Sequence, residues 1–337
     1  MSLWSRDVAV DLGTASTLVY VQGKGIVLRE PSVVAVSARN GGLLAVGEEA
    51  RNMVGKTPGE IIAVQPLRDG VIANFEMTEA MMAFFIRRAL QRKSVIGFSP
   101  RAIVCVPCEI TDVEKRAVEE ASRRAGVREA YIAEELMAAA IGAGLPVGEP
   151  FGCMVVDLGG GTSEAAVISF GGIVVYRSIR MGGLKMDESI VAYLKREYNV
   201  LIGDRTAEEL KINLGSAIDP KINNSMTVKG RNLTNGLPVT IDVYARDVRE
   251  ALKDSMNSII DMLRSTLEVT PPELASDIME RGIVLTGGGS LLQGLDMFIY
   301  RETGIPTLVA ENPMDCVALG AGRMLDHLDD LLRARRK

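Results

Sequence analysis

The chain has 337 residues, enough for about two ordinary domains, and its apolar and charged fractions of 47% and 24% exclude a mainly disordered protein. A net charge of −5 argues against nucleic-acid binding by bulk neutralisation of phosphates, so we expect no nucleic-acid partner. The 4 cysteines are too few for a disulfide-stapled secreted scaffold, and the 1 histidine leaves little room for a histidine-based metal site.

The N-terminal segment, residues 1–7, has no apolar core of the kind a signal peptide carries. The sequence also contains no uninterrupted apolar stretch of about 18 residues, the length that a membrane-spanning helix needs. We therefore expect a cytoplasmic protein without a transmembrane segment.

Residues 8–21 predict a strand, a tight glycine-containing turn and a second strand, because apolar runs flank the turn and no helical period follows it. The same layout recurs over residues 154–167, where Asp157 follows Asp11 by 146 positions. Chance could give part of this match. We infer two related halves, each opening with a hairpin.

Helices are predicted after both hairpins. Thr111 with Glu114 forms a capping box that opens one helix, and Thr206 with Glu209 forms a second capping box that opens another. Residues 134–141 read as a helix of small residues that permits close packing.

A long amphipathic helix is expected from about Asp247 to Leu267, ended by Pro271-Pro272. Residues 283–286 then read as a buried strand that runs into glycines and a further helix, while residues 219–240 read as strands and loops. Strands and helices alternate throughout, which predicts an α/β fold.

Glycine-rich corners occur at Gly13, at 159–161 and at 287–289. Glycine lets the backbone approach a ligand closely and turn N–H groups toward an anionic phosphate. Asp11 and Asp157 precede the first two corners at strand ends, where a carboxylate can hold Mg²⁺ directly or through water. The matched pair therefore predicts phosphate binding.

Two common phosphate-binding motifs are absent. Gly55-Lys56-Thr57 resembles the end of a P-loop, but the required earlier glycine position is Ala50. A dinucleotide-binding fingerprint needs a helix after its glycine turn, whereas a strand is predicted here. The sequence supports neither a P-loop nucleotidase nor a dehydrogenase.

The paired corners Asp11-Leu-Gly-Thr and Asp157-Leu-Gly-Gly-Gly-Thr resemble the two phosphate loops of the ATPase superfamily of actin, sugar kinases and heat-shock chaperones. Finer matches resemble the bacterial actins of the MreB family. They run from about residue 6 to residue 330 and include these segments: Gly25-Ile-Val-Leu-Arg-Glu-Pro-Ser-Val-Val-Ala, Asp69-Gly-Val-Ile-Ala, Ala138-Ala-Ala-Ile-Gly-Ala-Gly-Leu-Pro, Gly230-Arg-Asn-Leu and Leu285-Thr-Gly-Gly-Gly.

The resemblance implies an actin-like ATPase fold with two lobes of duplicated origin and four subdomains around a central nucleotide cleft. It implies a first lobe over 1–142 with a small subdomain inserted at 33–70. The second lobe would span 143–320, with a small subdomain at about 182–245, and residues 321–337 would return to the first lobe as a C-terminal helix.

The resemblance also implies ATP and Mg²⁺ as ligands, with Asp11 and Asp157 organising the metal ion through its waters. Glu135 would orient the attacking water with Thr162 beside it; alternatively, Glu135 is a solvated acid that the helix dipole favours. The nucleotide contacts carried over are Gly13, Thr14 and Ala15 in the first phosphate loop, Gly159, Gly160, Gly161 and Thr162 in the second, Glu208 and Lys211 beside the nucleoside, and Gly287, Gly288, Gly289 and Ser290 beside the adenosine and phosphates.

Two departures from the family pattern put the hydrolysis rate in doubt. Leu136 stands where the family usually has proline after Glu135, which leaves the local backbone less constrained. Leu184-Lys185 stands where an acidic pair is typical. Cys105 and Cys108 have redox spacing, but we interpret them as buried structural cysteines.

The function implied by the resemblance is an ATP-dependent filament of head-to-tail subunits with weak ATPase activity, which lies on the inner membrane face and organises cell-wall elongation proteins to maintain rod shape. Val95, Ile96 and Phe98 lie between basic residues and either pack on their own subdomain or dip into an anionic membrane. The amphipathic N-terminal helix that often assists such contact is not evident. The alternatives are a soluble sugar kinase of the same superfamily and a chaperone-type ATPase, for which no substrate domain is evident.

Overall fold

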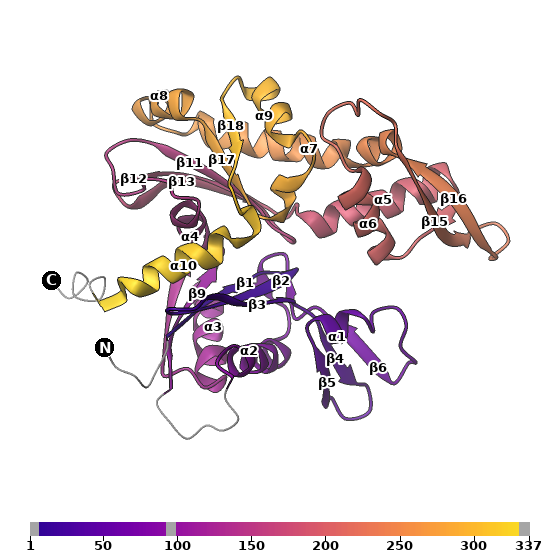
Figure 1. The fold of residues 1–337 in the computed structure, drawn as a ribbon, viewed down its shortest axis with the longest axis horizontal. Helices are drawn as coiled ribbons and strands as arrows, with labels where there is room; N and C mark the ends of the chain where they lie inside the picture. Colours follow the sequence, from indigo (N-terminus) through magenta and orange to yellow (C-terminus); the bar gives the residue numbers. More distant parts are fainter. Residues whose placement is uncertain (1–6, 92–98, 330–337) are drawn as a thin grey trace. The chain divides into compact units, whose positions relative to one another are not determined.

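The computed structural model describes residues 7–91 and 99–329 (Figure 1). The chain forms two compact units. The first comprises Met1–Glu149, Phe170–Ile173 and Met314–Lys337, and the second comprises Pro150–Ser169 and Val174–Pro313. The finer division into four subdomains stays a prediction.

The first unit is built on a five-stranded sheet of order β10-β9-β1-β2-β3. Strands β1 and β2 form the predicted antiparallel hairpin, β3 continues it, and β9 and β10 add parallel strands beside β1. The strands are β1 (Val8–Leu12), β2 (Ser16–Val21), β3 (Gly25–Pro31), β9 (Arg101–Val106) and β10 (Glu129–Glu134).

Helices cover both faces of this sheet, with α4 and α10 on one face and α2 and α3 on the other (Figure 1). The helices are α2 (Phe75–Ala89), α3 (Asp112–Arg124), α4 (Glu135–Gly142) and α10 (Cys316–Asp326). The capping box of Thr111 and Glu114 is present at the start of α3, as predicted. A core of buried Val, Ala, Met and Phe side chains joins the helices to the sheet.

Helix α4 packs on α10 through small residues, as its sequence predicted. A Cβ atom at Gly142 would lie 1.8 Å from the carbonyl oxygen of Cys316, and one at Gly320 would lie 1.8 Å from that of Ala138. Only glycine allows this approach, because no real Cβ contact is that short. The close packing fixes the helix that begins with Glu135.

Between β3 and α2 the chain makes a smaller three-stranded sheet of order β5-β4-β6 and a short hairpin. The elements are β4 (Val34–Ser37), β5 (Leu43–Val46), α1 (Glu48–Arg51), β6 (Ile61–Val64), β7 (Leu67–Arg68) and β8 (Val71–Ile72).

The second unit repeats the topology of the first in a sheet of order β13-β12-β11-β17-β18, as expected for related halves. Strands β11 and β12 form the second predicted hairpin, and β17 and β18 add parallel strands beside β11. The strands are β11 (Cys153–Leu158), β12 (Ser163–Ser169), β13 (Gly172–Ile179), β17 (Ile283–Thr286) and β18 (Thr307–Val309).

A second three-stranded sheet, of order β14-β15-β16, lies within residues 200–244. Its strands are β14 (Val200–Leu201), β15 (Ser225–Asn232) and β16 (Pro238–Tyr244). The helices of this unit are α5 (Gly183–Glu197), α6 (Asp204–Leu214), α7 (Ala245–Glu268), α8 (Pro272–Arg281) and α9 (Leu295–Thr303). Short 3₁₀ turns are η1 (Gly288–Leu291), in the second unit, and η2 (Pro313–Asp315).

The second predicted capping box is wrong. Helix α6 begins at Asp204 with Gly203 at its N-cap, and no side chain caps it. Thr206 therefore lies inside the first turn, because the chain leaves β14 and enters the helix earlier than the Thr-x-x-Glu pattern indicated. The long helix α7 and the strand β17 lie where the sequence predicted them.

Candidate functional site

The first glycine corner joins β1 to β2 within the first unit. Leu12 pairs with Thr17 at the end of the hairpin, which leaves Gly13, Thr14, Ala15 and Ser16 as the link. A Cβ atom at Gly13 would lie 2.6 Å from the carbonyl oxygen of Ser16, so the turn requires glycine.

Hydrogen bonds from neighbouring loops hold this corner. The Ser32 hydroxyl donates to the Gly13 carbonyl oxygen at 2.6 Å and lies 2.8 Å from the Thr17 hydroxyl. The amide of Gly70 donates to Thr14 Oγ1 at 3.0 Å. The corner is therefore fixed on two sides before any ligand binds.

Asp11 and Glu135 both lie near the thiol of Cys105. Asp11 is opposite Cys105 in the parallel register of β1 and β9, and Glu135 opens α4 directly after β10. Burial raises the pKa of Cys105 well above its ordinary value, and the charges of Asp11 and Glu135 raise it further. The first unit thus gathers the predicted metal carboxylate and the predicted water-orienting carboxylate around one buried, unreactive thiol.

The second glycine corner joins β11 to β12 within the second unit. Leu158 pairs with Ser163, and the Gly159 amide donates to the Thr162 carbonyl oxygen at 2.9 Å, which closes the turn. The N-terminus of α5 packs on this turn: the Gly183 amide donates to the Gly159 oxygen at 3.0 Å and the Leu184 amide to the Gly160 oxygen at 2.9 Å.

Asp157 is 5% exposed and accepts a hydrogen bond of 2.7 Å from Thr286 Oγ1. Burial raises the pKa of this carboxyl, and the hydrogen bond partly opposes the rise. Thr286 reaches it because β11 and β17 pair in parallel with these two residues opposite each other.

Both corners present amide groups without a protein acceptor. Within residues 7–91 and 99–329, the N–H groups of Thr14, Ala15, Gly160, Gly161 and Thr162 donate to no protein oxygen. Clustered backbone N–H groups of this kind form a concavity that suits an anion. This arrangement is the feature of each unit that most directly indicates phosphate binding.

The third corner follows β17 in the second unit. Gly287 has φ +76, and a Cβ atom there would lie 2.5 Å from the Leu158 carbonyl oxygen. Ser290 Oγ donates to the Gly287 oxygen at 2.6 Å, and the amide of Gly287 donates to Pro313. The glycines therefore let the 287–290 turn lie against the end of β11, next to the second glycine corner.

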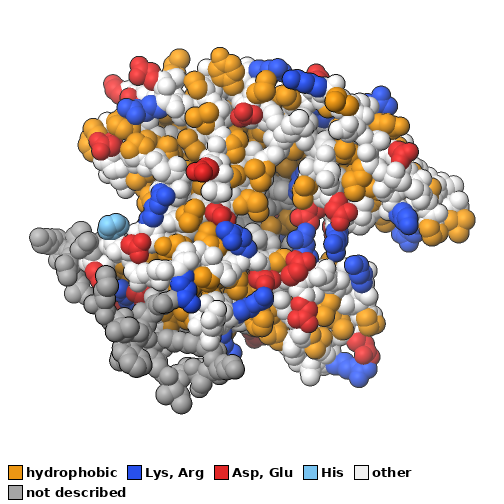
Figure 2. Space-filling model, in the orientation of Figure 1, with side chains coloured by type: hydrophobic (Ala, Val, Ile, Leu, Met, Phe, Trp, Pro, Cys, Tyr) orange, Lys and Arg blue, Asp and Glu red, His pale blue; other side chains and the backbone are white. Residues whose placement is uncertain are grey.

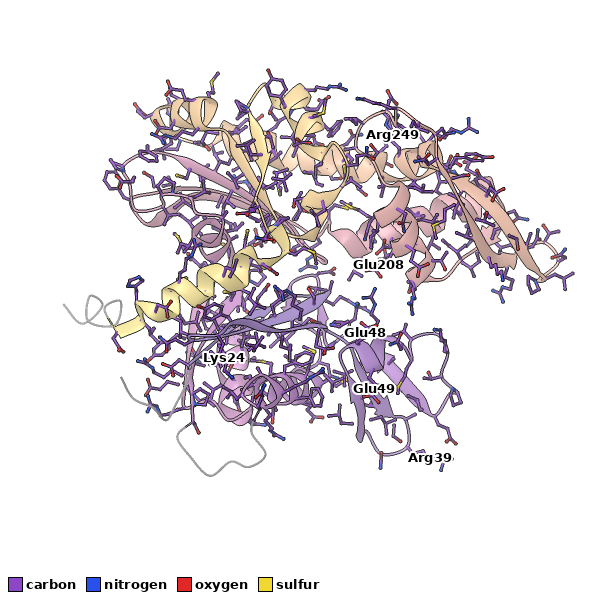
Figure 3. All side chains as sticks on the ribbon, in the orientation of Figure 1. Lys24, Arg39, Glu48, Glu49, Glu208 and Arg249 are labelled. Carbon is purple, nitrogen blue, oxygen red and sulfur yellow. The ribbon has the colours of Figure 1, made fainter. Side chains whose placement is uncertain are left out.

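Glu208 and Lys211 lie one turn apart on α6, where Figure 3 labels Glu208. Lys211 Nζ lies 2.8 Å from Asp187 Oδ1 and donates to the Gly183 carbonyl oxygen at 2.7 Å. Burial raises the pKa of Asp187 to about 6; Lys211 lowers it, and Glu208 and Asp204 raise it.

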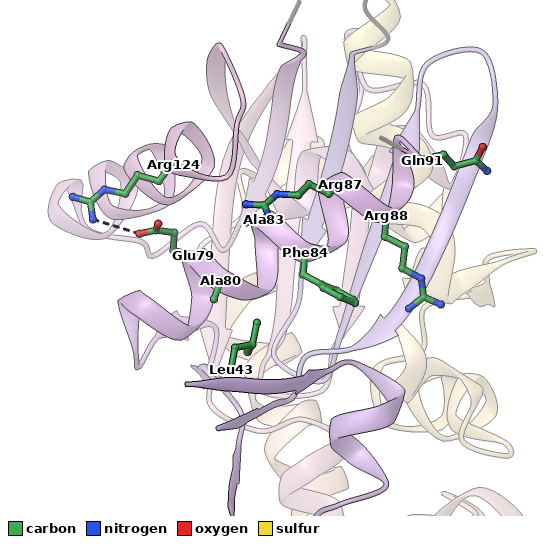
Figure 4. A pocket seen from close by; sticks show the side chains of 9 residues that line it. All are labelled: Leu43, Glu79, Ala80, Ala83, Phe84, Arg87, Arg88, Gln91 and Arg124. Atoms are coloured by element: carbon green, nitrogen blue, oxygen red, sulfur yellow. Dashed lines mark hydrogen bonds and ion pairs between the residues drawn. The ribbon is translucent and has the colours of Figure 1, made fainter. Parts of the chain in front are cut away.

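A separate surface pocket of about 640 Å³ opens in the first unit beside α2 (Figure 4). Leu43, Phe84 and Arg87 are among the residues that line it, and none of the predicted nucleotide contacts does. Its other two arginines are engaged: Arg88 lies 2.7 Å from Glu30, and Arg124 lies 3.4 Å from Glu79. This pocket is therefore not the nucleotide site that the glycine corners indicate.

Comparison with known proteins identifies the family. A family model described as MreB/Mbl protein matches residues 5–333. The chain belongs to the MreB/Mbl family. The cell shape-determining protein Mbl of Bacillus subtilis (strain 168) is 51% identical over 329 residues, or 98% of each chain. The cell shape-determining protein MreB of Escherichia coli (strain K12) is 50% identical over 331 residues, which cover 97% of this chain and 95% of that protein.

Solved structures confirm the actin-like fold that the sequence predicted. The crystal structure of MreB5 of Spiroplasma citri bound to ADP matches with a TM-score of 0.93 at 36% identity, covering 98% of each chain. The MamK double helical filament matches with a TM-score of 0.80, covering 96% of this chain and 99% of that chain, and at 22% identity it shows the fold alone.

Several residues of these sites were not predicted from the sequence. Three side chains contact predicted site residues from which they are distant in the sequence. These contacts are Ser32 with Gly13, Thr286 with Asp157, and Asp187 with Lys211. An acidic pair, Asp187-Glu188, follows Leu184-Lys185 after one intervening residue. Cys105 is buried as expected, whereas Cys108 is half-buried.

The predicted membrane-contacting residues Val95, Ile96 and Phe98 lie outside the described residues. In the part of the chain that the structure describes, no helix is long and apolar enough to cross a membrane. On the face drawn in Figure 2, acidic and basic side chains are intermixed.

Proposed function

We propose that this MreB/Mbl family member binds ATP with Mg²⁺ and assembles head to tail into filaments on the inner membrane face, where it organises cell-wall elongation and maintains rod shape. The observation that carries the nucleotide part is the pair of glycine corners, each with free amides and each preceded by a shielded aspartate. The relatives that are named cell shape-determining proteins support the cellular role.

The residues present fit a nucleoside triphosphate and a divalent ion. The amides of Thr14, Ala15 and 160–162 would bind phosphate oxygens, since they donate to no protein oxygen in the described part of the chain. Asp11 and Asp157 would organise Mg²⁺ and its waters, since carboxylate oxygens are ligands it prefers. The ion, when bound, would neutralise the negative charge of the phosphates.

The nucleoside would lie beside Glu208 and Lys211 on α6 and beside the turn from Gly287 to Ser290. Structures of Spiroplasma citri MreB5 bound to ADP and to AMPPNP support a nucleotide as the ligand, since that relative matches almost the whole chain. A Cβ atom at Gly289 would lie 2.9 Å from Leu158 Cβ, so glycine there keeps the turn packed on β11, beside the second glycine corner.

Hydrolysis would depend on two side chains. Glu135 would orient the attacking water, and the Thr162 hydroxyl would assist it from the second phosphate loop. Leu136 is fully buried, so packing of α4 rather than a proline fixes the backbone at Glu135. Positioning dominates phosphoryl transfer, and a slow turnover tied to assembly is the activity we propose.

Nucleotide-loaded subunits would add through a heterologous contact that does not close, which gives an open filament. The MamK and MreB5 matches support an actin-like subunit, and filament formation is what we propose for this chain. Membrane contact through Val95, Ile96 and Phe98 is part of the proposal. Flotation with anionic vesicles tests it: replacing all of these residues by serine should abolish binding, and unchanged flotation would contradict the assignment.

A sugar kinase of the same superfamily is not favoured, because the MreB/Mbl family model matches residues 5–333. A coupled assay with a panel of hexoses and polyols separates the two functions. We expect no stimulation of ATP turnover by any of them, whereas a strong stimulation by one would replace the filament proposal with a kinase.

Calorimetric titration with ATP, in Mg²⁺ and in chelator, tests the nucleotide site. Wild type should bind ATP more tightly with Mg²⁺, and Asp157→Asn should lose that difference. Asp254→Asn is the matched control, because Asp254 is an exposed aspartate on α7. Equal Mg²⁺ dependence in wild type and Asp157→Asn would remove Asp157 from the metal site.

A further inference from the structure

A continuous run of hydrogen bonds leads from the second phosphate loop to helix α6. The carbonyl oxygens of Gly159 and Gly160 accept from the first amides of α5, at 3.0 and 2.9 Å. The next link is the carbonyl of Gly183, which accepts from Lys211 Nζ on α6 at 2.7 Å. Helices α5 and α6 pack side by side in this unit (Figure 1).

Lys211 is held by the protein itself. Its ammonium contacts both the Gly183 oxygen and Asp187 Oδ1, and its side chain is 17% exposed, against 8% for Asp187. The contact with Gly183 is a hydrogen bond and the contact with Asp187 is an ion pair. Together they fix α6 to the N-terminal part of α5.

The acidic residues around Asp187 make its contact with Lys211 depend on the positive charge of the lysine. Asp187 is on α5 and faces Glu208 and Asp204 as well as Lys211, all on α6. With those acids nearby, removal of the Lys211 charge would leave a buried carboxylate beside two others. A carboxylate so placed takes up a proton or moves toward water, and the first turn of α5 moves with it.

We propose that Lys211 is a positioning residue that holds the second phosphate loop, through Gly183, in the conformation that binds polyphosphate. The inference rests on the proposed nucleotide function and deepens it. This role of Lys211 differs from a direct contact with the nucleoside in two ways. It affects binding of the phosphates, and it requires Asp187.

Inorganic triphosphate separates the two roles because it has no nucleoside. Calorimetric titrations of wild type and Lys211→Met with ATP and with triphosphate measure the effect on each ligand. We expect Lys211→Met to weaken both by the same factor, on the order of tenfold. A loss for ATP alone would overturn the inference, because it would show a nucleoside contact only.

Variants of Asp187 provide a second test of the inference. Asp187→Asn should weaken triphosphate binding although Asp187 is not proposed to touch the ligand, and combining it with Lys211→Met should add little further loss, because both act through one link. If Lys211→Met does not fold, the double variant Asp187→Leu/Lys211→Met replaces the buried pair by apolar side chains and should fold while binding triphosphate weakly. Full additivity, or wild-type binding by the double variant, would overturn the inference.

Lys195→Met is the matched control, since Lys195 is an exposed lysine in the last turn of α5. It should bind both ligands as wild type does. If wild type binds neither ATP nor triphosphate, the proposed function fails and this inference with it. If wild type binds both and Lys211→Met binds them equally well, only this inference fails.

Discussion

Alanine at position 182 would insert a methyl group between α5 and the second glycine corner, which we propose as the second phosphate loop. Its Cβ atom would lie 2.5 Å from the Gly160 oxygen, 2.6 Å from the Gly160 carbonyl carbon and 2.8 Å from that of Gly161. A relaxed carbon–oxygen contact is about 3.3 Å, so the two segments must separate by about 0.8 Å. The φ of Gly182 is −144, which alanine adopts freely, so the effect is steric.

That separation would lengthen the two hydrogen bonds that α5 donates to the loop, now 3.0 and 2.9 Å, beyond useful range. Loss of two such bonds costs about 2 kcal/mol of unfolding free energy. If ATP binding requires the undisplaced loop, the same cost of about 2 kcal/mol corresponds to about 30-fold in the dissociation constant. We therefore expect Gly182→Ala to remain folded and to bind ATP on the order of 30-fold more weakly.

Urea unfolding and calorimetric ATP titration of the same preparation measure both effects. Gly148→Ala is the control, because Gly148 is exposed and a Cβ atom there meets nothing within 4 Å. Wild-type ATP affinity in Gly182→Ala would refute the reasoning, since it would show that the loop binds phosphate independently of α5.

Three further changes have expected outcomes. Thr286→Val removes the hydroxyl that donates to Asp157. It should lower the unfolding free energy in urea by about 1–2 kcal/mol and weaken Mg²⁺-dependent ATP binding. Unchanged ATP binding would show that this hydrogen bond does not support the nucleotide site. Gly320→Ala places a methyl group 1.8 Å from the Ala138 oxygen and should destabilise the first unit by about 3 kcal/mol, measured by thermal unfolding; a wild-type midpoint would contradict the packing of α4 on α10. Asp187 has its native pKa raised from 3.8 to about 6, so its stabilising contribution is present in acid and is lost as the pH rises through about 6. The difference in unfolding free energy between wild type and Asp187→Asn should fall by about 3 kcal/mol from about pH 4 to about pH 7, and a flat difference would refute this environment for the carboxyl.

The sequence was sufficient to predict the features that depend on short segments. The hairpins around Gly13 and around Gly159 to Gly161 were predicted because strand patterns flank a glycine turn, and both corners form in the structure. The helix over residues 245–268 was predicted within two residues because its apolar stripe is long and periodic. The capping motif at Thr206 failed because the segment before it sets the start of α6 at Asp204.

Side-chain partners from distant elements could not be predicted. Thr286 reaches Asp157 only because β11 and β17 pair in parallel with that register, and the register is a property of the assembled sheet. Asp187 meets Lys211 because α5 and α6 pack together, although the two residues are 24 positions apart in the sequence. Spacing alone predicts neighbours on one helix but not between helices.

Sedimentation with ATP and Mg²⁺ over a series of protein concentrations tests the central claim most directly. A nucleotide-dependent filament predicts no pellet below a sharp critical concentration and a pellet that grows linearly above it, with no pellet in chelator. Protein that stays in the supernatant at every concentration, with ATP bound, would contradict the proposal that this chain assembles by itself into filaments.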